Sequence, residues 1–353
     1  MYIFKTNFKK ENLFIFFLLI IYILTVNNSL GFYKDDEHFQ ILEPVAYLLG
    51  LNNVLLDHPW GINWEWEIEH RVRPWLQPNI YYFIVTSLKS ININDPFKWV
   101  LAIKTFNASL GFVSILCLFF SLRKYFDNKS AQFQYYIFFT FWFFPFLHTR
   151  TSSESLGIIL FCLSFPFLLN FFENKKNPTN IYKIIFFSFI LGLSVVVRPQ
   201  MIFTIFPITL WVLFFRINIK KLFFCSCGFL LAIILGLYVD SVNWGFFTNT
   251  YYQLYKIQIV GGFMSQFSLE PKPWWFYISS ILIELAPIYS WFFVFSFLYF
   301  FYKNPKSIFS WLIIGTYIIL TFFNHKETRF IFPIYIFAPF FLIYIFGKFK
   351  NLK

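Results

Sequence analysis

The sequence predicts an all-α polytopic membrane protein with ten or eleven membrane helices. Of its 353 residues, 58% are hydrophobic and only 13% are charged, whereas roughly a quarter are charged in a soluble domain. The mean hydropathy of +0.60 leaves too little polar surface to cover a water-soluble body of 42.7 kDa. Apolar runs recur along the chain at the length that crosses ~30 Å of hydrocarbon as a helix. A disordered, fibrous or disulfide-stapled protein is excluded.

Eight charge-free runs account for most of the predicted helices. They are 13–33, 105–122, 130–147, 155–172, 222–239, 285–302, 307–324 and 330–347. Two shorter runs, 184–197 and 199–215, flank Arg198 and Pro199, and a third, 74–88, follows the first long polar segment. The first run is too long for a cleavable signal peptide and lacks a small-residue cleavage site, so we expect it to be retained.

The charge distribution predicts which segments share a side of the membrane. The 29 Lys and Arg outnumber the 17 Asp and Glu, and their clusters mark the cytoplasmic side by the positive-inside rule. In a membrane protein an excess of Lys and Arg normally lies in cytoplasmic loops next to anionic lipid, so nucleic acid is not an expected partner. Alternation from the C-terminus groups four polar segments on the opposite face, at 31–73, 148–154, 240–274 and 324–329. The run 74–88 then has both ends outside, so it is either re-entrant or wrongly bounded.

Several kinds of chemistry find no support in the sequence. The four cysteines all lie in apolar runs, where Cys behaves as a small hydrophobe. No His, Asp and Cys residues have metal-ligand spacing, and Gly261-Gly262 does not begin a nucleotide loop. A metal-bound nucleotide sugar is therefore not expected, and the donor of any transfer reaction should be a lipid.

Acidic residues directly follow the first membrane run, at Asp35, Asp36 and Glu37. One interpretation is a solvated first turn of a helix, where carboxylates favour the helix dipole. The other is functional, because a general base that works on a lipid-linked substrate has to lie just above the hydrocarbon.

Three further features call for a polar partner or ligand. Arg198 interrupts a long apolar stretch, and an arginine in hydrocarbon usually pairs with a carboxylate, a carbonyl or a phosphate. The segment 324–330 packs several ionisable groups into a short loop between two helices, which solubility alone does not explain. Trp60, Trp64 and Trp66 fit either an interfacial aromatic belt or rings that stack on a sugar.

Six short motifs follow one another along the chain. They are Asp36-Glu37-His38-Phe39-Gln40, Trp64-Glu65-Trp66, Arg73-Pro74-Trp75-Leu76-Gln77-Pro78, Arg150-Thr151-Ser152-Ser153-Glu154-Ser155, Val197-Arg198-Pro199 and His325-Lys326-Glu327-Thr328-Arg329-Phe330. In this order they resemble the glycosyltransferase family 22 mannosyltransferases, which use dolichyl-phosphate-mannose, and in particular the GPI mannosyltransferase branch. Two residues depart from the family pattern: Glu154 stands where Asn is usual, and Asp35 where Pro is usual.

The resemblance implies a GT-C glycosyltransferase fold, with short helices in the first outer loop and the active site on the lumenal or periplasmic face. The whole chain, 1–353, would be one transmembrane domain with an outer catalytic loop at 31–75 and a second outer loop at 240–274. The implied reaction moves mannose, with inversion and without a metal or cofactor, from a polyprenyl- or dolichyl-phosphate-mannose donor to a lipid-linked glycan or glycolipid acceptor.

The resemblance also suggests roles for individual residues. Asp36 matches the catalytic base, and Glu37 is a second catalytic candidate or an orienting group. For the donor phosphate the candidates are Arg198, Arg329, Lys326 and His325, and arginine suits this role because its fork meets two phosphate oxygens at once. The candidates for substrate binding are Gln40, Trp64, Glu65, Trp66, Arg73, Arg150 and Glu327.

Three other functions stay open: transfer of another lipid-linked sugar, a non-catalytic scaffold or flippase, and a secondary transporter. A transporter predicts inverted repeats and mid-membrane charge, whereas no repeat is evident and the charges sit mostly at helix ends. Residues 348–353 carry no dilysine retrieval pattern, and the abundance of Phe, Ile and Lys is typical of an AT-rich genome. A bacterial inner membrane is therefore expected rather than the endoplasmic reticulum.

Overall fold

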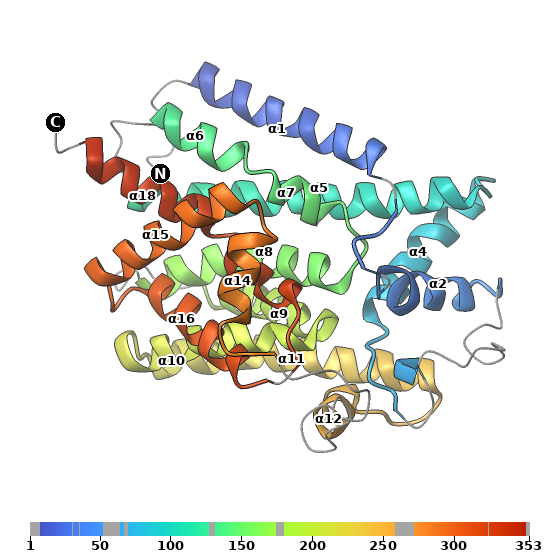
Figure 1. The fold of residues 1–353 in the computed structure, drawn as a ribbon. Coiled ribbons are helices and arrows are strands. Elements are labelled where there is room, and N and C mark those ends of the chain that lie inside the picture. Colours follow the sequence, from blue (N-terminus) through green and yellow to red (C-terminus); the bar gives the residue numbers. More distant parts are fainter. Residues whose placement is uncertain are drawn as a thin grey trace.

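The structure, a computed structural model, describes residues 8–29, 31–34, 36–51, 64–66, 70–126, 131–173, 180–257, 272–323 and 325–350. All regular elements in these ranges are helical (Figure 1). The longer helices are α1 (Phe8–Asn28), α4 (Leu76–Ser90), α5 (Pro96–Leu122), α8 (Ser153–Glu173), α9 (Ile181–Val197), α10 (Ile202–Phe215), α11 (Ile219–Trp244), α15 (Pro287–Lys303), α16 (Ile308–Thr321) and α18 (Ala338–Lys350). The shorter elements are η1 (His38–Leu42), α2 (Glu43–Leu48), η2 (Trp64–Trp66), η3 (Arg123–Tyr125), α6 (Ala131–Phe139), α7 (Phe143–His148), η5 (Pro199–Met201), α12 (Thr250–Tyr255), α14 (Phe276–Ile283), η7 (Thr328–Ile331) and α17 (Phe332–Tyr335).

Polar caps fix where several of the long helices begin and end. The Asp95 side chain accepts a hydrogen bond from the Phe97 N–H at 3.0 Å at the start of α5. Asn180 and Asn218 cap α9 and α11 in the same way. Such caps satisfy N–H groups that have no partner within the helix. Gly245, with φ of 76°, ends α11 in the left-handed conformation that glycine adopts without strain.

Three described helices have the length and composition to cross a membrane: Pro96–Tyr125, Ser153–Glu173 and Ile219–Trp244. A fourth span is formed if the pair Thr328–Tyr335 and Ala338–Gly347, bent by 45°, is counted as one. Shorter apolar helices are Asn12–Asn28, Ile181–Val197, Pro199–Phe215 and Ile308–Thr321. Within the described ranges, helices of full spanning length are thus fewer than the ten or eleven predicted.

Proline explains why two of the predicted runs are broken. The run 130–147 forms α6 and α7, with a break before Phe143. Pro145 has no N–H for the Phe141 carbonyl, and its ring clashes with that group in a continuous helix. In the same way Pro339 prevents a continuous helix through Tyr335, and the run 330–347 bends there. Each of these two predicted helices is thus divided into shorter pieces, and the second pair can still form one bent span.

The problematic run 74–88 forms α4, which lies beside α2 at the end of the molecule where α1 ends and α5 begins (Figure 1). Ile41, Val45, Tyr81, Val85 and Trp99 form a small core between α2, α4 and α5. Helix α4 therefore packs with α2 and the start of α5 at this end of the molecule.

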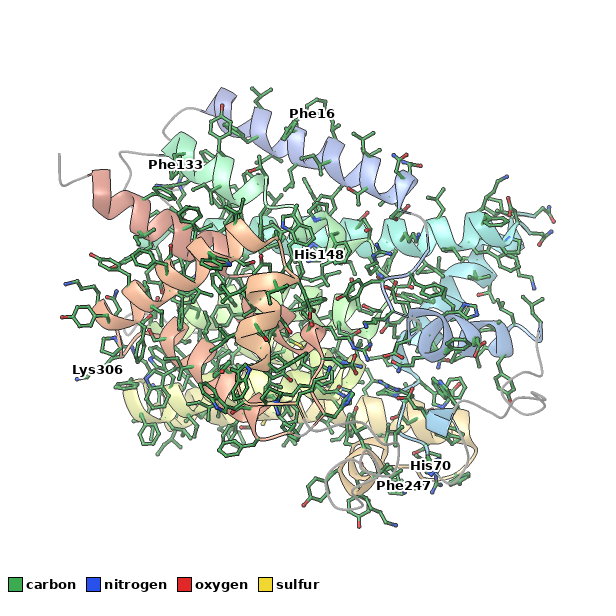
Figure 2. The ribbon with its side chains drawn as sticks, in the orientation of Figure 1. Phe16, His70, Phe133, His148, Phe247 and Lys306 are labelled. Atoms are coloured by element: carbon green, nitrogen blue, oxygen red, sulfur yellow. The ribbon has the colours of Figure 1, made fainter. Side chains whose placement is uncertain are left out.

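The main core is built from aromatic and aliphatic side chains of the bundle. Large apolar side chains are also exposed on the outer helices, among them Phe16 and Phe133 (Figure 2). Lys306 and His70 lie at opposite ends of the molecule in the same view. The arrangement is that of a multi-pass membrane protein.

Candidate active site

Five charged residues that are far apart in the sequence meet at the end of the bundle that carries α2 and α4. Asp36 follows α1, Glu154 lies in the first turn of α8, and Arg198 joins α9 to η5. Glu327 and Arg329 come from the start of η7. Ion pairs connect all five residues, which we call the ionic site.

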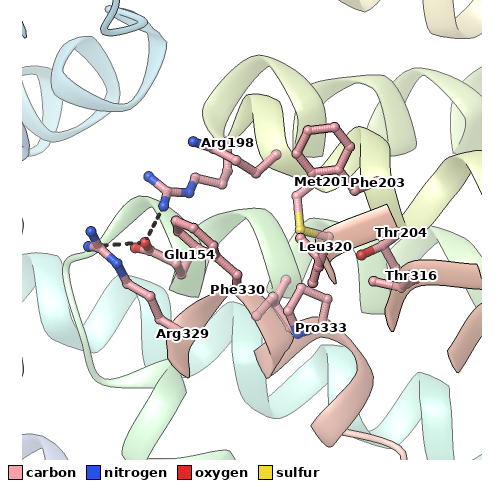
Figure 3. A pocket seen from close by; sticks show the side chains of 12 residues that line it. Glu154, Arg198, Met201, Phe203, Thr204, Thr316, Leu320, Arg329, Phe330 and Pro333 are labelled. Carbon is pink, nitrogen blue, oxygen red and sulfur yellow. Dashed lines mark ion pairs between the residues drawn. The ribbon is translucent and has the colours of Figure 1, made fainter. Parts of the chain in front are cut away.

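Glu154 lies between the two arginines (Figure 3). Its Oε1 is 2.6 Å from Arg198 Nη2 and 3.2 Å from Arg329 Nη1. Arg198 Nη1 also donates a hydrogen bond to Ser153 Oγ at 3.2 Å. Glu154 and Arg198 are both buried, so each charge depends on the other because an unpaired buried charge is strongly destabilising.

Local sequence explains why Arg198 reaches this site. Pro199 disfavours the helical conformation at the residue before it. Arg198 accordingly ends α9 in an extended conformation, with φ of −135° and ψ of 96°. A small cleft opens beside its guanidinium, with an apolar wall formed by Met201, Leu320 and Pro333.

Arg329 contacts three carboxylates at once. Its Nη2 pairs with Asp36, its Nη1 with Glu154, and its Nε lies 2.7 Å from Glu327 Oε2. The side chain of Asp36 is 31% exposed, against 7% for Glu154 and 22% for Glu327. Asp36 is therefore the carboxylate of the ionic site with the best access for a substrate.

Glu327 is held in its ionised form by its neighbours His325 and Arg329. Burial opposes ionisation, but hydrogen bonds from His325 at 2.8 Å and from Arg329 at 3.0 Å outweigh it. The pKa of Glu327 lies well below its usual range as a result. The stabilisation that follows from this is present above the usual pKa of Glu and is lost only as the pH falls through the lowered value.

A pH series of thermal unfolding in detergent tests this carboxylate. We expect Glu327→Gln to lower the unfolding temperature by a constant amount between about pH 5 and pH 8, and the difference to narrow only in stronger acid. Glu173→Gln is the control, because Glu173 pairs with Lys124 in a partly exposed position at the opposite end. A difference that already fades between about pH 8 and pH 6 would contradict the lowered pKa.

Glu37 is placed differently from its neighbour Asp36. Its side chain is buried, and Oε1 accepts a hydrogen bond from the Tyr33 N–H at 2.9 Å. Oε2 accepts from the Thr151 N–H at 3.3 Å and from Thr151 Oγ1 at 3.4 Å. Burial raises the pKa of Glu37, while these hydrogen bonds and Arg150 oppose the rise. These hydrogen bonds tie the Asp36 segment to the loop before α8.

A buried amide network holds that loop in turn. Gln77 donates to the Thr151 carbonyl at 2.8 Å, and Asn107 donates to the Arg150 carbonyl at 2.8 Å. Both amides also donate to the hydroxyl of Tyr81. Helices α4 and α5 thereby hold the loop that binds Glu37, the residue next to Asp36.

The network makes a stability prediction. We expect Asn107→Leu to destabilise the protein by about 1–3 kcal/mol, because the Arg150 carbonyl loses its buried donor. Asn28→Leu is the matched control, since Asn28 donates to the carbonyl of Leu24 on an exposed surface of α1. Equal unfolding midpoints for the two variants in detergent would show that the network does not hold the loop.

The other predicted phosphate ligands differ in their surroundings. Lys326 is buried and donates to the carbonyls of Lys272, at 2.9 Å, and Phe323. Lys272 donates back to the Lys326 carbonyl at 2.9 Å. The Lys326 ammonium is therefore engaged by the backbone, whereas His325 touches the ionic site through Glu327.

Three of the predicted substrate-binding residues, Arg73, Glu65 and Arg150, lie near the ionic site. Arg73 pairs with Glu65 and interacts electrostatically with Asp36 and Arg329, so this pair borders the ionic site. Arg150 donates to the Gly31 carbonyl at 3.3 Å.

The remaining candidates are less accessible. Trp66 is buried against Trp75 and Trp244, so its ring faces other tryptophans rather than an open cleft. Gln40 is buried in η1. The side chain of Trp64 lies outside the described part of the structure, as do Asp35, Asn324 and residues 52–63 and 258–271 of the predicted outer loops.

Sequence reasoning missed three carboxylates that matter at this end of the molecule. Glu154 was noted only as a departure from a motif, yet it lies at the centre of the ionic site. Glu284 accepts a hydrogen bond from Thr328 Oγ1, next to Arg329. Asp240, fully buried in α11, accepts from the Trp75 N–H at 2.8 Å and anchors the start of α4. A carboxylate directly beside a long apolar run was the available signal for Glu154 and Asp240.

Residues 12–352 match the profile of the Alg9-like mannosyltransferase family. The chain belongs to this family. It is 25% identical over 339 residues to GPI mannosyltransferase 3 of Candida albicans, and 23% identical over 330 residues to GPI alpha-1,2-mannosyltransferase 3 of Bos taurus. These alignments cover 94% and 91% of this chain but only 64% and 56% of the two relatives.

A solved structure supports the fold. The crystal structure of ArnT from Cupriavidus metallidurans bound to undecaprenyl phosphate matches with a TM-score of 0.66 at 12% identity, and the match covers 96% of this chain and 60% of that one. The predicted GT-C fold is confirmed by this match. The resemblance drawn from the six motifs is confirmed by the family match.

Proposed function

We propose that the protein is an inverting mannosyltransferase that moves mannose from a polyprenyl- or dolichyl-phosphate-mannose donor to a lipid-linked glycan or glycolipid. Membership of a mannosyltransferase family supports this over a transporter or a scaffold. The single observation that carries the chemistry is the ionic site, where an accessible carboxylate, Asp36, lies beside the paired guanidiniums of Arg198 and Arg329.

The proposed reaction exchanges one bond at C1 of mannose and transfers one proton. The acceptor hydroxyl oxygen attacks C1 of mannose from the face opposite the phosphate, and the bond between C1 and the phosphate oxygen breaks with its electron pair. The hydroxyl proton passes to Asp36 as the base. The polyprenyl phosphate leaves with an added negative charge that Arg198 and Arg329 stabilise.

The carboxylates around Arg329 suggest how donor binding could release Asp36 to act as the base. The Nη1 and Nη2 groups of Arg329 are engaged by carboxylates, and the most accessible of these is Asp36. A donor phosphate that takes the Arg329 Nη2 displaces Asp36 toward the acceptor side. Glu37 stays bonded to Tyr33 and Thr151 during this step and limits how far Asp36 moves.

The Arg73–Glu65 pair borders Asp36 and Arg150 borders Glu37, and we assign all three residues to the acceptor. We place this site on the non-cytoplasmic face, because Lys306 lies at the other end of the molecule and Glu173, the partner of Lys124, ends α8 away from Glu154. The remaining alternative is a transferase of the same fold that uses another lipid-linked sugar.

A donor comparison with purified protein tests the proposal. Radiolabelled polyprenyl-phosphate-mannose, polyprenyl-phosphate-glucose and GDP-mannose are each supplied with a membrane extract of lipid-linked acceptors. We expect label in the glycolipid fraction from polyprenyl-phosphate-mannose alone. Transfer from the glucose donor would favour a transferase of another lipid-linked sugar. Transfer from GDP-mannose would show that the enzyme does not require a lipid-linked donor.

A further inference from the structure

An apolar cavity of about 360 Å³ lies among α8, α9, α10 and α11. Its wall on α8 begins at Phe165 and ends at Phe172, near the end of that helix, whereas Glu154 of the ionic site lies in the first turn. The cavity and the cleft beside Arg198 share no lining residue. A void of this size is typical of a ligand pocket, since close-packed interiors hold few voids larger than a water molecule. The cavity is therefore separate from the ionic site and calls for an occupant of its own.

The cavity opens to the surface between α10 and α11. Three of its lining residues, Thr209 on α10 and Ser226 and Leu230 on α11, are exposed. Packing explains this opening, because α10 packs mainly on α16, whereas α11 packs mainly on α9. Phe206 on α10 and Phe223 on α11 are exposed as well. Both helices therefore present apolar surface, and in a membrane the opening faces lipid.

A lysine marks the end of the cavity that is farther from the ionic site. The Lys221 ammonium donates a hydrogen bond to the Phe171 carbonyl at 2.7 Å and lies 4.3 Å from the centroid of the Phe171 ring. The residues that directly follow these two, Phe172 and Leu222, both line the cavity. The ammonium therefore lies where α8 and α11 meet at the edge of the cavity.

The sequence around this end of the cavity is strongly positive. From residue 174 to residue 239 the chain has no Asp or Glu, and Lys183 and Lys220 accompany Lys221 at the starts of α9 and α11. By the positive-inside rule this end lies on the cytoplasmic side, where the leaflet carries anionic lipids. An apolar cavity with cations at its edge complements a ligand that has a hydrocarbon chain and an anionic head group.

We propose that the cavity binds one acyl chain of an anionic phospholipid of the cytoplasmic leaflet, with the lipid phosphate at Lys221. Basic pockets between membrane helices on this side suit anionic head groups. Ser226, exposed at the opening, lies five residues beyond Lys221 on α11, which is about 7 Å deeper along the helix. Its hydroxyl donates to an ester carbonyl of the lipid, since the ester groups lie between the phosphate and the acyl chains.

Two features favour a phospholipid over the lipid-phosphate donor of the proposed reaction. The donor phosphate is assigned to Arg198 and Arg329, which lie with the end of α9 and the start of α8, at the far end of these helices from Lys221. A polyprenyl phosphate also has no ester group for Ser226. Phospholipid binding needs no sugar transfer, so this inference goes beyond the proposed function and does not depend on it.

Thermal unfolding of the purified protein in detergent, titrated with lipid, measures recognition of the head group. We expect phosphatidylglycerol to raise the unfolding temperature at lower concentrations than phosphatidylcholine with the same acyl chains. Lys221→Gln should weaken phosphatidylglycerol binding about fivefold, the factor for one Lys at the membrane surface, and Lys221→Arg should restore it. Lys303→Gln is the matched control, since Lys303 ends α15, a helix that does not line the cavity. Equal stabilisation by the two lipids, or an equal loss for Lys221→Gln and Lys303→Gln, would overturn the proposal.

Photolysis of phosphatidylglycerol that carries a diazirine in one acyl chain locates the chain. We expect label within residues 205–212 and 222–230 of the wild type. Ser226→Phe should lose most of this label because its ring fills the opening, whereas Leu231→Phe, at an exposed position of α11 outside the lining, should keep it. Unlabelled phosphatidylglycerol should remove the label at lower concentrations than undecaprenyl phosphate. Label outside these segments, equal label in the two variants, or equal or stronger competition by undecaprenyl phosphate would contradict a phospholipid site.

Discussion

Replacing Asp36 by Asn is expected to lower the turnover of mannosyl transfer by about 10²–10⁴-fold, the range for loss of a general base. Asn has nearly the same size and still offers Arg329 an oxygen, but it does not take a proton from the acceptor hydroxyl. The Asp36 side chain is partly exposed, so the protein should remain folded and inserted. The measurement is the initial rate with saturating polyprenyl-phosphate-mannose, together with the thermal unfolding midpoint.

Glu37→Gln is the matched comparison because the two acids are adjacent in the chain. Both Glu37 oxygens accept hydrogen bonds from the protein, and an amide group offers only one acceptor oxygen for them. We expect a lower unfolding midpoint and a smaller loss of turnover than for Asp36→Asn. If Asp36→Asn stays active and Glu37→Gln is inactive at an unchanged midpoint, the base has been assigned to the wrong carboxylate.

Arg329→Lys should have the second largest effect. Lysine keeps the charge but not the planar fork that reaches Asp36, Glu154 and Glu327 together. We expect kcat/KM for the donor to fall by about 10²-fold or more, since a buried, hydrogen-bonded charge pair is broken where the phosphate has to bind.

Arg216→Lys is the control for this substitution. Arg216 is exposed at the opposite end of the bundle, where its guanidinium lies 5.7 Å from the ring centroid of Trp211. It should leave kcat/KM unchanged. Equal donor kinetics for both variants would remove Arg329 from the phosphate site.

Hydropathy predicted where the apolar helices lie, because the membrane requires long runs without charge. It did not predict where helices break, since the breaks before Phe143 and near Ile336 depend on missing backbone donors at Pro145 and Pro339. Nor did hydropathy show that α4 packs on α2 at the end of the molecule. An apolar helix that packs on α2 has the same composition as a short membrane helix.

The ionic site could be predicted in part. Asp36, Arg198 and Arg329 were recognisable as charges beside or within apolar runs, and the structure brings them together. The different surroundings of Asp36 and Glu37 could not be predicted, because adjacent residues of a helical turn point about 100° apart and only the packing decides which one pairs with Arg329. The contacts of Glu154 with both arginines could be found only from the position of α8 in the structure.

The most direct test of the proposed reaction is transfer of radiolabelled mannose from polyprenyl-phosphate-mannose to endogenous glycolipid, in membranes that contain the wild type or Asp36→Asn at equal levels, with EDTA in both. The expected result is labelled glycolipid from the wild type and none above background from the variant. Equal labelling by both proteins, or labelling that EDTA abolishes, would contradict a metal-independent transfer that depends on Asp36.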